Sequence, residues 1–207
     1  MAEQRLKYAF RLVHIDNISH VNRYGFVHKD SKYAKPDYVP IGDQSIINVR
    51  ESAIIHGLGT IGQCIPFYFG PRSPMLYVIQ NGFNNVTRYS PEQLVYCVVL
   101  LEDLIRDNID CIFTDGHALS GLTKIYPKEE LPNINNIIRY SDVYTKYWFS
   151  EDDLDLKRRK EAEILVKEEL GPEYIKGYVV YNANAKDKLL GFGINPEKIV
   201  IKQDYYF

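Results

Sequence analysis

The sequence has few cysteines and no long hydrophobic run, and each absence excludes a class of protein. Its 3 cysteines are an odd number and lack the Cys-x-x-Cys spacing of zinc sites and redox motifs. We therefore expect buried free thiols, no disulfide framework and no metal site. No apolar stretch approaches the roughly 20 residues that a membrane span requires, and the N-terminus lacks a signal-peptide pattern. These absences predict a cytoplasmic protein without a membrane segment.

Signatures of common nucleotide-binding and hydrolytic enzymes are also absent. The chain contains no P-loop, no Gly-x-Ser-x-Gly elbow and no His-Glu-x-x-His motif. Gly57, Gly59 and Gly62 do have the spacing of the dinucleotide-binding fingerprint. They precede an expected strand, however, whereas the fingerprint must follow one. We therefore interpret these residues as a plain glycine loop.

The composition that remains is that of an ordinary globular protein with a surplus of tyrosine. Of its 207 residues, 45% are hydrophobic and 25% are charged, which predicts a single domain over residues 1–207. A net charge of -2 argues against a basic nucleic-acid-binding protein as a whole. A local basic cleft would still suffice for a transient contact with DNA. The 17 tyrosines fit either strand surfaces or a wet aromatic cleft.

Hydrophobic periodicity predicts helices and strands that follow one another without regular β-α-β alternation. This pattern favours an α+β fold over a doubly wound sheet. Segment 28–44 is predicted to be an exposed basic loop, and 127–155 a long connection with broken helices. The expected strands are 6–15, 64–69, 94–101, 111–114, 178–181 and 197–207. The expected helices are 17–25, 45–55, 101–107, 157–170 and 183–192.

Taken one at a time, the polar residues beside these elements have ordinary explanations. Glu161 and Glu163 border an apolar run and fit the solvated face of an amphipathic helix. His117 follows an expected strand, a common position for functional residues and also for satisfied loop histidines. Arg50 fits a surface arginine of a helix. No single residue of this group identifies a site.

Five segments taken together are more informative than any single residue. They are His14–Ile18, Ile65–Tyr77, Phe113–His117, Lys160–Val166 and Val200–Phe207. In this order and spacing, the segments resemble the DarT family of DNA ADP-ribosyltransferase toxins. The second segment is the most specific, because its residues fit the family's pattern without a break. The resemblance extends over essentially the whole chain.

The resemblance implies a fold, an activity and two partners. The implied fold is the ADP-ribosyltransferase α+β fold with a split central β-sheet, as in poly-ADP-ribose polymerases and diphtheria-type toxins. The implied reaction cleaves NAD⁺ at the nicotinamide–ribose bond and transfers ADP-ribose to a base of single-stranded DNA. One branch of the family modifies thymine and another guanine, and the departures from the family's pattern favour guanine. The implied protein partner is a macrodomain antitoxin of the DarG type.

The resemblance also assigns roles to particular residues. Glu163 falls on the catalytic glutamate and Arg50 on the essential arginine. The implied NAD⁺-binding residues are Arg11, His14, Asn17, Arg50, Met75 and His117. The residues expected to bind DNA are Lys157, Arg158, Tyr147 and Trp148. Arg11 departs from the family, which often has histidine at that position, but an arginine suits a contact with the NAD⁺ diphosphate.

These residue types suit the implied chemistry. Breaking the glycosidic bond places positive charge on the ribose, which a carboxylate such as Glu163 would stabilise. The same carboxylate could take a proton from the attacking base. Aromatic rings such as Tyr147 and Trp148 stack on unpaired bases, and Lys157 and Arg158 would hold the DNA backbone.

Two alternative functions remain open at the level of sequence. The motifs specify NAD⁺ better than they specify the acceptor, so a transferase of the same fold could modify protein or RNA. The residue at Arg11 and the short spacing after Arg50 would also fit an NAD-binding module without catalysis.

Overall fold

The structure is a computed structural model and describes residues 4–55, 59–167 and 169–207. Its main feature is an eight-stranded sheet in the order β10-β9-β5-β1-β4-β8-β6-β7. The strands are β1 (Tyr8–His14), β4 (Ile65–Tyr68), β5 (Leu94–Leu100), β6 (Cys111–Thr114), β7 (Ile125–Pro127), β8 (Glu163–Val166), β9 (Ile175–Val180) and β10 (Ile199–Ile201). A separate two-stranded sheet pairs β2 (Ile54–Ile55) with β3 (Gly59–Thr60).

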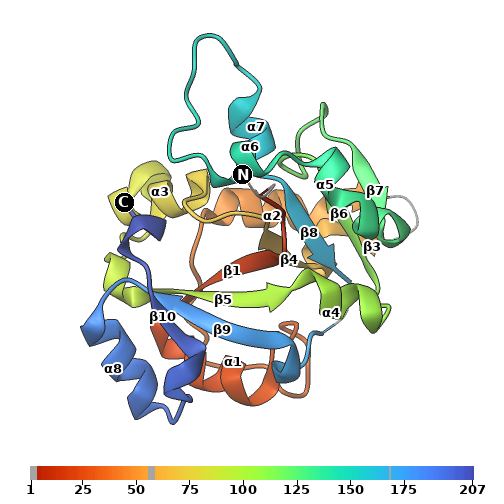
Figure 1. The fold of residues 1–207 in the computed structure, drawn as a ribbon. Coiled ribbons are helices and arrows are strands. Elements are labelled where there is room, and N and C mark those ends of the chain that lie inside the picture. Colours follow the sequence, from red (N-terminus) through yellow and green to blue (C-terminus); the bar gives the residue numbers. More distant parts are fainter. Residues whose placement is uncertain (1–3, 56–58, 168) are drawn as a thin grey trace.

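Short helices surround the sheet (Figure 1). The α-helices are α1 (Ile18–Tyr24), α2 (Gln44–Ser52), α3 (Pro74–Asn81), α4 (Leu101–Arg106), α5 (Ile134–Ile137), α6 (Tyr140–Tyr144), α7 (Leu156–Lys160) and α8 (Ala183–Gly191). The 3₁₀-helices are η1 (Ile15–Asn17), η2 (Ile61–Gln63), η3 (Phe83–Asn85), η4 (Pro91–Gln93), η5 (Lys128–Asn133), η6 (Pro172–Tyr174), η7 (Pro196–Lys198) and η8 (Gln203–Tyr205). Figure 1 shows the connection between α6 and α7 rising from the body as a long loop. The mixture of elements confirms the predicted α+β class.

The sheet is nearly divided in two between β1 and β4. These strands share the single register pair Phe10–Tyr68, whereas β1 pairs with β5 along its whole length. Pro66 of β4 has no N–H to donate. Its carbonyl oxygen accepts a hydrogen bond from Nη1 of Arg11 at 3.0 Å. The Arg11 side chain therefore occupies a position where backbone hydrogen bonds between β1 and β4 would otherwise continue. The sheet is split at this point, as the resemblance implied.

Alternating side chains pack the central strands on both faces. In β1, Ala9 and Val13 belong to one hydrophobic cluster, whereas Phe10 and Leu12 belong to another. Successive side chains of a strand point to opposite faces, so a strand covered on both sides is apolar throughout. The same pattern runs along β5, which confirms the strand predicted over 94–101.

Residues 157–170 do not form the single helix that the sequence predicted. Helix α7 ends at Lys160, and strand β8 begins at Glu163. Strand β8 pairs with β4 on one side and β6 on the other, and all of its residues are buried. A charged helical turn followed by a short buried strand can contain as many apolar residues as one amphipathic helix of the same total length. Periodicity alone therefore could not separate the two.

The strand predicted over 197–207 is also wrong for most of its length. Strand β10 covers Ile199–Ile201, and η8 and a short tail follow it. The hydroxyl of Tyr206 donates to the carbonyl oxygen of Val179 at 2.8 Å and lies 3.1 Å from that of Leu94. The tail is therefore fixed across the β5–β9 pair by a buried tyrosine instead of extending the sheet.

The remaining expectations concern cysteine, glycine and membrane segments. The three cysteines are free and buried, as predicted. In the glycine loop, Gly57 lies outside the described residues, Gly59 is in β3 and Gly62 is in η2. Within the described part of the chain, no helix has both the length and the apolar character to cross a membrane.

Candidate active site

A cleft of about 740 Å³ opens where the two halves of the sheet diverge. Strands β1 and β4 and the first residue of β8 contribute to its lining, together with α2, α3 and α7. Segment 40–43 forms a further part of the wall. Sites for small molecules and cofactors commonly have volumes of roughly 300–1,000 Å³. The cleft is therefore large enough for a dinucleotide-sized ligand.

Glu163 lies in this cleft, and its carboxylate is fixed by three donors. Nη1 of Arg50 donates to Oε1 at 3.0 Å, and Nη2 donates to Oε2 at 2.9 Å. The backbone N–H of Ala118 donates to Oε1 at 3.1 Å. The Arg50 and Glu163 side chains are only 13% and 1% exposed. Two parallel hydrogen bonds from a guanidinium set both the position and the plane of a carboxylate.

Arg50 comes from α2, a helix whose start is defined by a capping residue. The carboxylate of Asp43 accepts a hydrogen bond from the N–H of Ser45 at 2.9 Å. Burial lowers the pKa of Arg50, but the charge and hydrogen bonds of Glu163 outweigh burial and hold the pKa above its usual value. The guanidinium therefore stays charged throughout the physiological pH range.

The backbone of Glu163 is held from both neighbouring strands. Tyr68 of β4 lies opposite it in the antiparallel register. On the other side, the hydroxyl of Thr114 accepts the Glu163 N–H at 3.3 Å and donates to the carbonyl oxygen of Gly116 at 2.7 Å. This hydroxyl links the start of β8 to the loop that follows β6.

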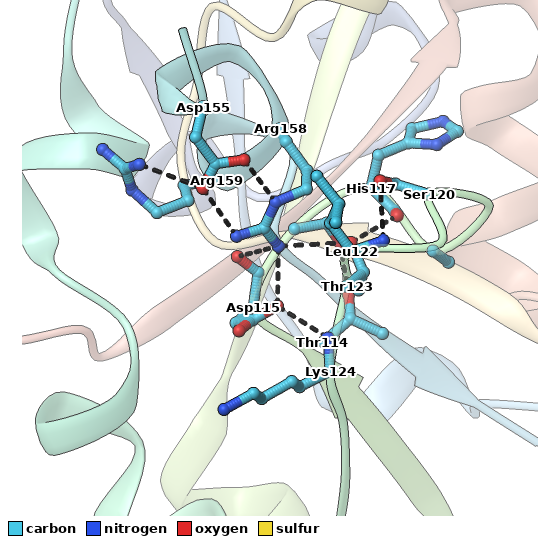
Figure 2. A network of polar contacts seen from close by, with 12 residues as sticks. Thr114, Asp115, His117, Ser120, Leu122, Thr123, Lys124, Asp155, Arg158 and Arg159 are labelled. Atoms are coloured by element: carbon cyan, nitrogen blue, oxygen red, sulfur yellow. Dashed lines mark hydrogen bonds and ion pairs between the residues drawn. The ribbon is translucent and has the colours of Figure 1, made fainter. Parts of the chain in front are cut away.

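That loop carries His117 and Ala118, and Arg158 holds it in place (Figure 2). Nη1 of Arg158 lies 2.8 Å from Oδ1 of Asp115. Nε and Nη2 lie 2.7 Å and 2.8 Å from the two carboxylate oxygens of Asp155. The carbonyl oxygen of Arg158 accepts the N–H of His117 at 3.0 Å. The Arg158 network thus positions the loop whose next N–H binds Glu163.

His117 lines the cleft, and Figure 2 shows its ring pointing away from the Arg158 network. Burial lowers the pKa of His117. The nearby charge of Glu163 opposes this effect, and those of Arg50 and Lys157 reinforce it. The ring is therefore neutral at neutral pH, with one nitrogen able to donate and the other able to accept a hydrogen bond.

The structure divides the six residues predicted to bind NAD⁺ into two groups. Four of them line the cleft, namely Arg11, Arg50, Met75 and His117. His14 and Asn17 do not line it. His14 is the last residue of β1 and Asn17 the last of η1. Both are polar, so the sequence could not distinguish a ligand contact from an internal one.

Asn17 and His14 instead make contacts within the protein. The side-chain amide of Asn17 accepts the N–H of Val39 at 3.0 Å and donates to its carbonyl oxygen at 2.7 Å. Nδ1 of His14 accepts the N–H of Asp16 at 3.3 Å, and the ring lies 4.8 Å from that of Tyr89. Asn17 thereby fixes the segment that leads directly into the cleft wall at residue 40.

The four residues predicted to bind DNA occupy different environments. Lys157 and Arg158 line the cleft, although Arg158 is paired with carboxylates. Tyr147 is 78% exposed on the loop between α6 and α7. The ring of Trp148 packs 5.4 Å from that of Phe207. Within the described residues, Lys157 is the cleft residue of this group without an ion pair, and Tyr147 has a highly exposed ring.

Sequence reasoning missed three parts of this site. The N–H of Ala118 belongs to the backbone, so no residue type signals its role. The hydroxyl of Thr114 acts through a contact with residue 163 that only the β6–β8 pairing creates. Glu161 also lines the cleft, although the sequence predicted a solvated helical position. No pattern in the sequence marked it, because Glu161 lies in the turn between α7 and β8.

Two proteins of similar sequence cover most of this chain. It is 27% identical over 183 residues to a DNA ADP-ribosyl transferase of Escherichia coli, covering 87% of this chain and 83% of that protein. It is 32% identical over 177 residues to a DNA ADP-ribosyl transferase–DNA ADP-ribosyl glycohydrolase fusion protein of Thermosipho africanus. That match covers 85% of this chain but only 43% of the fusion protein.

Solved structures share the fold. Thermus sp. 2.9 DarT in complex with ADP-ribosylated ssDNA superposes with a TM-score of 0.85 at 22% identity, covering 100% of this chain and 99% of that chain. Thermosipho africanus DarTG in complex with ADP-ribose gives a TM-score of 0.79 at 27% identity, covering 97% of this chain and 51% of that chain.

The cleft at the split of this mostly antiparallel sheet contains a glutamate that an arginine holds in place. Together with the shared fold, this arrangement defines an ADP-ribosyltransferase. Residues 10–207 match the family model described as "ssDNA thymidine ADP-ribosyltransferase, DarT". The chain belongs to the DarT family. It is an NAD-dependent ADP-ribosyltransferase that acts on single-stranded DNA.

Proposed function

We propose that this enzyme transfers ADP-ribose from NAD⁺ to thymine in single-stranded DNA and releases nicotinamide. The observation that carries the proposal is the Arg50–Glu163 pair, which fixes a buried carboxylate inside a cleft of suitable size. The comparisons do not support the guanine preference expected from the sequence, because the description of the matching family names thymidine as the modified nucleoside. We therefore name thymine as the acceptor base.

In this proposal, Glu163 stabilises positive charge that develops on the ribose next to the departing nicotinamide. A preorganised carboxylate in a site with little water is effective in this role, because it needs no reorganisation during the reaction. Arg50 and the Ala118 N–H set its orientation. Arg50 is thus assigned a positioning role toward Glu163.

The cleft also fits NAD⁺ by its chemistry. Bound NAD⁺ supplies the ADP-ribose and the nicotinamide leaving group. Within the described residues, the only hydrogen-bond acceptor for the Arg11 side chain is the Pro66 carbonyl, so further N–H groups remain for phosphate oxygens. Met75 contributes an apolar wall, and the neutral ring of His117 offers a donor and an acceptor. His14 and Asn17 would act on NAD⁺ only through the segments they hold.

The DNA strand would cross the mouth of the cleft between α7 and the loop that precedes it. Lys157 provides a phosphate contact, and Tyr147 on the exposed loop provides a surface for base stacking. Unpaired bases reach such a site without the cost of opening a duplex. Arg158 and Trp148 support this surface from within the protein.

The activity is tested by the intact mass of short oligonucleotides after incubation with enzyme and NAD⁺. One set of oligonucleotides lacks thymine and another lacks guanine. A mass gain of one ADP-ribose only when thymine is present is the expected result. A gain only with guanine would overturn the choice of base. No gain with either, from protein shown to bind NAD⁺, would move the acceptor to protein or RNA.

One variant, compared with wild type, separates catalysis from binding. Glu163→Gln keeps the size of the side chain and one acceptor oxygen but removes its charge. We expect it to bind NAD⁺ and to form no adduct. Full transfer by Glu163→Gln would contradict the assigned role and leave the chain as a transferase with another catalytic group.

The chain also has an expected protein partner. The similar fusion protein is described as joining a transferase to a DNA ADP-ribosyl glycohydrolase. We propose that a macrodomain antitoxin of the DarG type removes the modification made here. One sheet, although nearly divided between β1 and β4, contains strands from both ends of the chain, which supports treating residues 1–207 as one domain that such a partner would bind. Co-expression with a DarG-type macrodomain should abolish DNA adducts, and persistence of the adducts would refute the pairing.

A further inference from the structure

Transfer to thymine requires a side chain that accepts a proton from the thymine ring. This requirement rests on the proposed function. In a DNA thymine, one ring nitrogen carries deoxyribose and the other carries hydrogen. A new bond at the second nitrogen therefore displaces a proton. A side chain within reach of that nitrogen must accept the proton if the step is to be fast near neutral pH.

Glu163 is poorly arranged to accept this proton. Arg50 and Ala118 together donate three hydrogen bonds to its two oxygens. These hydrogen bonds occupy lone pairs on both carboxylate oxygens, so the side chain is already committed to the protein. Protonation of Glu163 would also disrupt the ion pair with Arg50 inside a site from which water is largely excluded.

The other acidic side chains that line the cleft differ in how they are paired. Asp43 accepts hydrogen bonds from Ser45 at the start of α2. Glu51 forms an ion pair with Lys29 at 2.8 Å. Glu161 accepts no hydrogen bond from any group in the described part of the chain. Its carboxylate is therefore the one in the cleft whose lone pairs are not committed to the protein.

Glu161 is also well placed relative to the reacting groups. It lies between α7, which supplies Lys157, and β8, which begins with Glu163. All three side chains line the same cleft. The backbone of Glu161 is fixed by a hydrogen bond from its N–H to the carbonyl oxygen of Arg158 at 3.1 Å. Its position is thus set by the network that orients the catalytic carboxylate.

We propose that Glu161 is the general base that removes the ring proton of the acceptor thymine. The thymine N–H bond breaks and its proton moves to the Glu161 carboxylate. The ring nitrogen forms a bond to C1′ of the ribose as the bond from C1′ to nicotinamide breaks. The electron pair of that bond leaves with the nicotinamide nitrogen. Glu161 then returns the proton to solvent.

The electrostatics of Glu161 agree with this role. Burial raises its pKa to about 7, the positive charge of Lys157 opposes the rise and the negative charge of Glu163 adds to it. Burial raises the pKa of Tyr68 on β4, and the negative charges of Glu163 and Glu161 add to this effect. A general base works best when its pKa is near the working pH. His117 is the weaker base of the two, because burial lowers its pKa.

The test compares Glu161→Gln with wild type at saturating NAD⁺, using a thymine-containing oligonucleotide and single-turnover conditions. Loss of a general base should slow transfer by about 10²-fold or more. The affinity for NAD⁺, measured by calorimetry, should change less than about threefold. In wild type the transfer rate should rise with pH through about 7, and in Glu161→Gln this rise should be absent. Glu102→Gln changes an exposed glutamate on α4 and is the matched control.

A second substrate distinguishes a base from a purely structural residue. Replacing thymine by 5-fluorouracil makes the ring N–H more acidic, so a variant without its base should recover at least tenfold relative to wild type. Wild-type rates in Glu161→Gln, or a loss that 5-fluorouracil does not relieve, would overturn the proposal. If wild type forms no thymine adduct at all, the proposed function fails instead, and the two failures are distinct.

Discussion

At the residue scale, the site depends on two side chains that are 113 positions apart in the chain. Arg50 approaches Glu163 with both terminal nitrogens, and little of either side chain is exposed. Water screens such a pair far less than it screens a surface ion pair. Loss of one partner would therefore leave a buried charge without compensation.

The first prediction concerns the shape of the arginine side chain. Arg50→Lys should reduce kcat by about 10²-fold, because a lysine ammonium cannot make two parallel bonds and the carboxylate would move. The measurement is the initial rate of oligonucleotide modification, with the circular dichroism spectrum as a check on folding. Arg106→Lys is the control, since Arg106 also binds a carboxylate with two nitrogens but belongs to α4. An Arg50→Lys variant as active as wild type would contradict the positioning role.

At the scale of elements, a buried lysine connects three segments just before β8, the strand that begins with Glu163. Lys160 ends α7, and its side chain is 1% exposed. Its Nζ donates to the carbonyl oxygens of Pro71 at 2.7 Å and Val143 at 2.5 Å. The turn after β4, helix α6 and helix α7 are thus tied together where β8 begins.

The second prediction follows from the titration of this lysine. Burial lowers the pKa of Lys160 to about 7, and the charge of Arg72 adds to the effect. The unfolded chain, with a lysine pKa of about 10.4, binds more protons between these values. Stability from Lys160 therefore rises with pH in this window. Relative to Lys160→Met, the wild-type free energy of unfolding should increase from about pH 7 to pH 10.

Urea unfolding of both proteins at several pH values provides the measurement. Lys202→Met, which changes an exposed lysine, serves as the control and should show no such trend. A difference between wild type and Lys160→Met that stays constant with pH would contradict the prediction. Such a result would mean that the two carbonyl hydrogen bonds offset the effect of burial, so that the pKa of Lys160 is the same in the folded and unfolded states.

At the scale of the whole molecule, a net charge of -2 means that DNA must be held by a local surface. The cleft has Lys157 and Arg158 side by side in the sequence but in different settings. Lys157 forms no ion pair within the described residues. Arg158 is paired with Asp115 and Asp155 and is 14% exposed.

The third prediction uses this contrast. Lys157→Ala should weaken DNA binding and reduce the slope of log Kd against log salt by about 1, as expected for one lost phosphate contact. Arg158→Ala should leave that slope unchanged and lower kcat about tenfold or more, because the loop that carries Ala118 loses its support. Fluorescence anisotropy over a range of salt concentrations and single-turnover rates measure the two effects. A reduced salt slope in Arg158→Ala would instead make this arginine a direct DNA contact.

Much of the fold was predictable from local patterns. Strand β5 is apolar throughout and β6 is apolar up to Thr114, so both were recognisable as buried strands. The segment 157–170 was not, because a charged turn and a buried strand together imitate a helical pattern. That error also changed the expected setting of Glu161 from solvent to the cleft.

The sequence by itself determined the α+β class and the buried thiols and, through resemblance, predicted roles for Glu163 and Arg50. Only the tertiary structure decided which donors bind Glu163, that Asn17 faces a loop, and that Glu161 lines the cleft. The physical reason is the separation along the chain of the residues that interact. Local periodicity depends on residues a few positions apart, whereas the site forms from contacts between strands and loops that are distant in the chain.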